Sequence, residues 1–62
     1  MLELGYNARK VHDFMVEWYG EHKDDHETGW FEGYIIGLST YEVITEEEED
    51  QLMVTLKELA SK

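Results

Sequence analysis

The chain contains no cysteine and no proline, and it has only five lysine and arginine residues. Without cysteine, disulfide bridges and thiolate zinc sites are excluded, and the absence fits a reducing compartment. Without proline or a long Gly/Ser linker, nothing marks an internal boundary. Residues 1–62 are therefore expected to form a single domain. A domain of this size buries only about 60% of the surface that its unfolded chain exposes, so its stability margin is thin.

Long apolar runs are also missing. A membrane-spanning helix needs roughly 18 to 20 apolar residues in succession, and no segment of the sequence approaches that length. The amino-terminal residues lack the order of a secretory signal, in which a basic stretch precedes an apolar stretch and a small-residue cleavage site. We therefore expect a cytoplasmic protein.

Positive charge is scarce relative to negative charge. Fifteen Asp and Glu residues against five Lys and Arg residues give a formal net charge of −10. Direct binding to nucleic acid or to an anionic membrane is therefore not expected. Between Glu21 and Leu52 there are eleven acidic residues and one basic residue, Lys23. This distribution predicts an acidic face on the second half of the molecule.

The first predicted helix covers residues 8–19, where apolar residues recur every three or four positions: Val11, Phe14, Met15 and Trp18. Asn7 is a favourable N-cap residue. Tyr6 and Val11 have the spacing of a hydrophobic staple. Gly20 is placed to end this helix in a left-handed turn. The polar residues 20–29 then interrupt the apolar pattern and predict a loop, in which Thr28 or Asp25 could cap the next helix.

The middle segment predicts a helix over residues 29–41, because its apolar residues follow helical spacing: Phe31, Tyr34, Ile35, Leu38 and Tyr41. Gly29, Gly33 and Gly37 recur on the opposite side and would allow another backbone to approach. Because glycine destabilises the interior of a helix, the same residues also weaken the helical prediction. An alternative is a β-hairpin over residues 30–44, since aromatic and β-branched residues are frequent there.

The third predicted helix covers residues 46–60. Thr45 and Glu48 have the spacing of a capping box. Acidic residues follow at once and favour the positive end of the helix dipole, and Lys57 and Lys62 lie toward its negative end. The apolar stripe consists of Leu52, Met53, Leu56, Leu59 and Ala60. Together these patterns predict an all-α fold, a small three-helix domain made of a helical hairpin and a third helix, with α+β as the alternative if residues 30–44 form the hairpin.

Catalytic and metal-binding patterns are weak. No Gly-rich phosphate loop or nucleophile elbow is present, and a chain this short has little volume with which to build a pocket. His22 and His26 would face the same way on a helix, as metal-binding pairs do, but no further cluster supplies the remaining zinc ligands. A solvated loop is the simpler interpretation. We therefore expect no enzyme activity, no cofactor and no bound metal.

Two features favour a binding role. The run from Glu46 to Asp50 suits a helix start, and it could also engage a basic partner or imitate a phosphate backbone. In addition, more apolar residues are present than the three stripes need: Leu2, Leu4, Val16, Tyr19, Trp30, Ile36, Tyr41, Val43, Ile44 and Val54. Exposed Trp and Tyr residues dominate binding hot spots. The predicted partner-binding residues are Trp30, Tyr41, Tyr19, Ile36, Glu46, Glu47, Glu49 and Asp50.

The leading hypothesis is a small acidic regulatory or inhibitory module that binds another protein, one with a basic surface. In size, acidity and lack of catalytic motifs, the chain resembles the small proteins that phages and mobile elements encode to block host enzymes or defence systems. That resemblance implies an inhibitor. The alternative hypothesis is a structural homo-oligomer, in which the apolar surplus and the glycines of the middle helix pack against another copy across a two-fold axis.

Overall fold

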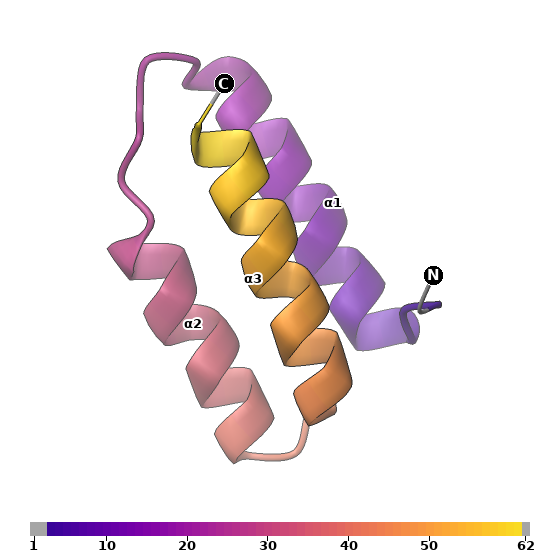
Figure 1. The fold of residues 1–62 in the computed structure, drawn as a ribbon. Coiled ribbons are helices and arrows are strands. Elements are labelled where there is room, and N and C mark those ends of the chain that lie inside the picture. The colour runs from indigo at the N-terminus through magenta and orange to yellow at the C-terminus, as the bar shows by residue number, and fades with distance from the viewer. Residues whose placement is uncertain (1–2, 62) are drawn as a thin grey trace.

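The computed structural model describes residues 3–61, which form three helices and no strand. The helices are α1 (Tyr6–Glu21), α2 (Gly29–Thr40) and α3 (Glu46–Ala60). They run up, down and up, so α1 and α3 are parallel and α2 is antiparallel to both (Figure 1). The predicted three-helix domain is confirmed, and the alternative hairpin over residues 30–44 is wrong. Leu2 and Lys62 lie outside the described residues.

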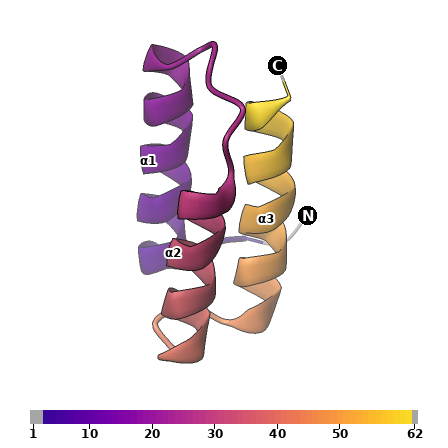
Figure 2. The same cartoon turned by 90° about the vertical axis from the view of Figure 1, so that its left-hand side faces the viewer.

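Helix α3 packs against both of the other helices, whereas α1 and α2 approach each other much less closely. Figure 2 shows α2 in front, with α1 on one side of it and α3 on the other. The seam between α1 and α2 is therefore wide at the level of the backbone. Aromatic side chains meet across it, with Phe14 and Trp18 of α1 contacting Phe31 of α2.

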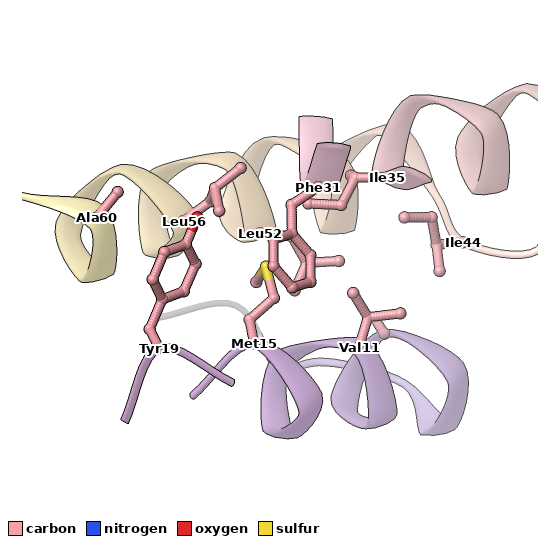
Figure 3. Packing of buried hydrophobic residues seen from close by; sticks show 10 residues of the cluster. Val11, Met15, Tyr19, Phe31, Ile35, Ile44, Leu52, Leu56 and Ala60 are labelled. Carbon is pink, nitrogen blue, oxygen red and sulfur yellow. The ribbon is translucent and has the colours of Figure 1, made fainter. Parts of the chain in front are cut away.

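The core lies where the three helices meet, and Figure 3 shows its side chains converging from all of them. Its buried members are Ala8, Val11, Met15, Tyr19, Phe31, Ile35, Ile44, Leu52, Leu56 and Ala60. Met15, Ile35, Leu52 and Leu56 are completely enclosed. Burial of an aliphatic side chain of this size contributes roughly 1.5–3 kcal/mol. These residues therefore provide most of the stability of a domain that has no disulfide.

The predicted core was partly wrong. Phe14 and Tyr34 were expected inside, yet 43% and 41% of their surface is exposed. Tyr19 and Ile44, which had no assigned place, are buried at 5% and 4% exposure. Phe14 and Tyr34 lie on the edges of their helical stripes that face the seam. Because the two backbones are far apart there, the rings sit at its mouth and remain accessible to solvent.

The ends of α1 also differ from the prediction. The N-cap is Gly5 and not Asn7, and the Gly5 N–H donates to the Glu48 carboxylate across a 2.6 Å hydrogen bond. Tyr6 is 74% exposed, so it forms no hydrophobic staple. The helix continues through Gly20 without a left-handed turn, because the His22 N–H closes the last turn on the Trp18 carbonyl at 2.9 Å.

The start of α3 is as predicted. The Thr45 hydroxyl oxygen accepts from the Glu48 N–H at 3.1 Å, and the Glu48 carboxylate accepts from the Thr45 N–H at 2.9 Å. The capping box is therefore complete. Helix α2 has no capping box. Thr28 occupies its N-cap position but makes no capping hydrogen bond, and its hydroxyl donates to Glu32 instead. The prediction that Thr28 or Asp25 caps α2 was wrong.

Candidate protein interface

Exposed apolar side chains gather along the seam between α1 and α2. Trp30 and Tyr41 are 67% and 82% exposed. Together with the partly exposed Phe14, Tyr34 and Val43, they form what we call the aromatic face. Trp30 and Tyr34 are four residues apart and lie on one side of α2, and Tyr41, the C-cap residue, follows Tyr34 by seven positions at the end of the same side. Phe14 faces them from α1.

Three rings of the aromatic face, those of Phe14, Trp30 and Tyr34, pack on one another or on the core, whereas the Tyr41 ring is 82% exposed. The ring centroids of Phe14 and Trp30 are 6.4 Å apart, and those of Trp30 and Tyr34 are 5.5 Å apart. Both Phe14 and Trp30 contact the buried ring of Phe31, at 5.6 Å and 4.9 Å. Their orientation is edge-on or tilted, which is the favourable geometry for aromatic pairs. Such contacts restrict the exposed rings before a partner arrives and so lower the entropic cost of binding.

A shallow groove of about 200 Å³ opens beside these rings. Its lining comes from α1, from α2 and from the turn after α2: Asn7, Lys10, Val11, Phe14, Tyr34, Leu38 and Val43. The groove is smaller than the roughly 300–1,000 Å³ of a typical small-molecule site. Its size and apolar walls suit one or two aliphatic side chains of a protein partner. The Lys10 amine lies at this end of α1, 5.0 Å from the centroid of the exposed Tyr6 ring.

Acidic residues border the aromatic face on its α1 side. Glu17 and Glu21 follow Phe14 by three and seven residues and are exposed, so they lie along the same edge of α1. Within residues 3–61 no lysine or arginine forms an ion pair with a carboxylate. The negative charge is therefore not neutralised locally, and it attracts cationic groups over about the 8–10 Å of the Debye length at ordinary ionic strength.

Of the predicted anchor residues, Trp30, Ile36 and Tyr41 are exposed, and their role in binding stays a prediction. Tyr19 is not exposed, and its placement on the surface was wrong. It continues the buried stripe of α1 four residues after Met15, and its hydroxyl donates to the Glu27 carbonyl at 2.5 Å. Burial raises the pKa of the Tyr19 phenol. The nearby carboxylates raise the same pKa further: Asp25, Glu27 and Glu32.

The predicted acidic residues lie elsewhere. Glu46, Glu47 and Asp50 are exposed on α3. Glu49 is half-buried and lines a cleft at the end of α2 with Ser39 and Thr40. Glu46 and Glu49 therefore lie with Glu42 at the end of α2, close along the chain to Tyr41 and Val43 of the aromatic face. On α1 the acidic residues nearest to Phe14 in the sequence are Asp13 and Glu17.

The two loop histidines do not form a pair. The His22 ring stacks on Trp18 with centroids 4.1 Å apart, and its Nδ1 is 2.8 Å from the Trp18 carbonyl oxygen. The His26 Nδ1 is 2.5 Å from the carbonyl oxygen of Ala60, at the end of α3. In the part of the chain that the structure describes, no group of His, Asp and Glu side chains is arranged to hold a metal ion.

A larger concavity lies at this loop. It is an open cleft of about 790 Å³ lined by residues 21–29. Throughout residues 3–61, no buried side-chain nitrogen or oxygen lacks a hydrogen-bond partner, so no unpaired polar group points into this cleft. None of the helices in the same range has the length and apolar character needed to cross a bilayer.

The sequence-based prediction did not identify the groove. Phe14, Tyr34 and Leu38 were assigned to the core, Val43 was counted only in the apolar surplus, and Lys10 was given no role. No local signal distinguishes them, since the width of the seam depends on how α1 and α2 both pack on α3. Comparison with protein families, with curated protein sequences and with solved structures finds no match to this chain. Function therefore has to be inferred from the chain's own surface.

Proposed function

We propose that this protein is a non-catalytic binding module, which docks a segment of another protein on the aromatic face and thereby regulates or inhibits that protein. The observation that carries the proposal is the cluster of exposed, mutually packed rings beside a side-chain-sized groove. Exposed apolar surface of this kind is disfavoured unless a partner covers it. Trp and Tyr residues are the commonest hot spots in protein interfaces.

The surroundings of the groove define the chemistry of the partner. The mainly apolar lining of the groove calls for an apolar stripe on the partner. Lys10 is the charged residue of that lining, so the basic residues of the partner belong at the other end of the stripe, beside the exposed Glu17 and Glu21 further along α1. A basic amphipathic helix supplies both, with anchors at spacings of three, four and seven residues. The net charge of −10 would also accelerate its approach, and this steering weakens with added salt.

A designed helical peptide of leucine and lysine tests the proposal. The peptide has no aromatic residue, so the tryptophan fluorescence of the titration comes only from Trp18 and Trp30 of the protein. We expect saturable binding that weakens with salt. The double variant Phe14→Ala, Tyr34→Ala should weaken it at least about tenfold, because each truncated hot-spot ring costs about 1–2 kcal/mol.

Two controls accompany the titration. The double variant Val16→Ala, Val54→Ala removes apolar groups of similar exposure, 43% and 52%, outside the aromatic face, and it should bind like the wild type. A peptide with glutamate in place of lysine should bind at least about tenfold more weakly, because like charges repel. Equal weakening by both double variants would show that the peptide adheres through charge alone and would contradict the proposal.

A further inference from the structure

The edge of α1 that borders the seam carries opposite charges at its two ends. Lys10, Phe14, Glu17 and Glu21 follow one another at spacings of four, three and four residues, and all are exposed, so they form one stripe along the helix. The stripe runs from a cation near the start of α1, past an aromatic ring, to two carboxylates near its end. An α-helix rises about 1.5 Å per residue, so about 16 Å separates the two ends of the stripe.

Lys10 belongs to the groove. Its side chain lines it together with Asn7 and Val43. Its amine lies 5.0 Å from the centroid of the Tyr6 ring, and the face of an aromatic ring attracts a cation. Within residues 3–61 the lysine forms no ion pair with a carboxylate. Its charge is therefore available to a group that docks in the groove.

Other charged side chains near this end line different clefts. Glu42, which precedes Val43 in the turn after α2, lines the cleft at the end of that helix. Arg9 and Asp13 line a separate cleft between α1 and α3. None of the three lines the groove. An occupant of the groove would therefore meet the positive charge of Lys10 at this end.

We propose that the docked segment is a helix that runs antiparallel to α1 and carries an acidic side chain near its carboxyl-terminal end, which pairs with Lys10. This inference rests on the proposed function and adds the direction and the charge order of the partner. The basic residues of the helix then lie in its amino-terminal half, beside Glu17 and Glu21. The helix dipole favours the same direction, because its positive end meets the two carboxylates and its negative end meets the lysine.

The opposite direction is unfavourable at both ends of the stripe. It would bring the basic half of the docked helix to Lys10 and its acidic residue to Glu17 and Glu21. Like charges brought together at an interface destabilise a complex. A helix that is basic along its whole length meets the same repulsion at Lys10 in either direction. Lys10 therefore selects, among basic amphipathic helices, those that end in an acidic residue.

Two peptides test the role of Lys10. Both share a leucine stripe and lysines in the amino-terminal half, and they differ at one position of the last turn, where one has glutamate and the other has lysine. Each is titrated into the wild type, Lys10→Glu and Arg9→Glu. Arg9 is the matched control, because it is the exposed neighbour of Lys10, loses the same charge and does not line the groove.

Both substitutions make the protein more negative and so favour the lysine peptide through long-range attraction. Lys10→Glu should shift the ratio of the two affinities toward the lysine peptide by at least about threefold more than Arg9→Glu does, which is the size expected of an exposed ion pair. Equal shifts in the two variants would mean that net charge alone sets the preference, and would overturn the inference.

A spin label tests the direction. The protein has no cysteine, so a nitroxide can be attached to a cysteine at either end of the glutamate peptide and stays on the peptide. A label at the carboxyl-terminal end should broaden the backbone amide signals of Lys10 and Val43. A label at the amino-terminal end should broaden those of Glu17 and Glu21. The reverse pattern, or equal broadening by both labels, would overturn the inference.

The outcome is distinguishable from failure of the proposed function. Saturable binding at the aromatic face without a preference set by Lys10 or without a single direction would remove this inference and leave the binding-module proposal standing. If neither peptide binds the wild type saturably, both proposals are wrong.

Discussion

Helices α2 and α3 have similar lengths but are stabilised in different ways. Helix α3 begins with a complete capping box, carries four acidic residues in its first turn and has Lys57 in its last turn. All of these features favour a helix before any tertiary contact forms. Helix α2 begins without a side-chain cap, has three interior or terminal glycines and contains one charge. It is held in place mainly by burial of Phe31 and Ile35.

The two helices differ in how far local sequence agrees with the fold. In α3, local propensity, capping and apolar pattern all favour the same structure, as expected of an element whose task is structural. In α2, exposed aromatic rings and glycines conflict with what a solvated helix needs. Local conflicts of this kind are expected at functional surfaces. The contrast therefore supports the assignment of α2 to binding and of α3 to support.

The largest expected effect separates the buried residues from those of the aromatic face. Leu52→Ala empties a fully enclosed site in α3 and should lower the free energy of unfolding by about 2–5 kcal/mol. Trp30→Ala removes a larger side chain that is 67% exposed, and it should cost about 1 kcal/mol or less. Urea denaturation followed by circular dichroism measures both values. Comparable losses of unfolding free energy in the two variants would mean that Trp30 stabilises the fold as much as a core residue does, and would contradict the distinction between core and aromatic face.

A smaller effect distinguishes the two helix starts. Thr45→Ala removes the side chain that caps α3 and should cost about 1 kcal/mol. Thr28→Ala is the matched change at the start of α2, where the threonine makes no capping hydrogen bond. Its cost should stay within about 0.5 kcal/mol, as for ordinary surface positions. If both variants lose the same free energy of unfolding, α2 is capped in solution and the contrast between the helices is weaker than described.

The smallest expected effect is the contribution of the Glu48 carboxylate to stability at different pH values. Its pKa is lowered from the ordinary value of 4.5, first because its carboxylate accepts from the Thr45 backbone N–H and then because it accepts from the Gly5 N–H. A carboxylate with a lowered folded-state pKa stabilises the fold above its ordinary pKa. That contribution is lost as the pH falls through the lowered value.

The variant Glu48→Gln isolates this contribution, because glutamine preserves the capping-box geometry without the charge. The wild type should melt at a higher temperature than Glu48→Gln above pH 4.5, and the difference should vanish as the pH falls through the folded-state pKa. Glu47→Gln, which changes an exposed carboxylate of the same turn, should show a smaller dependence. If the difference in melting temperature between wild type and Glu48→Gln stays constant on acidification, the charge of Glu48 does not strengthen its hydrogen bonds to Gly5 and Thr45.

Much of this structure was predictable because its signals are local. The capping box of Thr45 and Glu48, the leucine stripe of α3 and the three-helix organisation all follow from neighbours within a helical turn. The start of α1 was not predictable, since the residue that holds Gly5 is Glu48, 43 positions away. The exchange of Tyr19 for Phe14 has a similar cause. Phe14 belonged to the predicted stripe and Tyr19 lay beside it, and only the packing of α1 against the other helices decides which of the two is buried.

The candidate site was predictable only in part. The exposure of Trp30 and Tyr41 could be inferred from the surplus of apolar residues. The groove could not, because Phe14, Tyr34 and Val43 come from three separate segments whose meeting depends on the width of the seam. Glu46, Glu47 and Asp50 are exposed on α3, as the prediction requires, but they do not line the groove.

The most direct test of the binding assignment is a map of backbone amide chemical shifts while the leucine–lysine peptide is titrated into the isotope-labelled protein. The largest changes should fall on the residues that line the groove and on Trp30, and the exposed acidic turn of α3 should change little. Changes confined to the acidic residues 46–50, with the groove unaffected, would contradict the assignment of the aromatic face as the binding site.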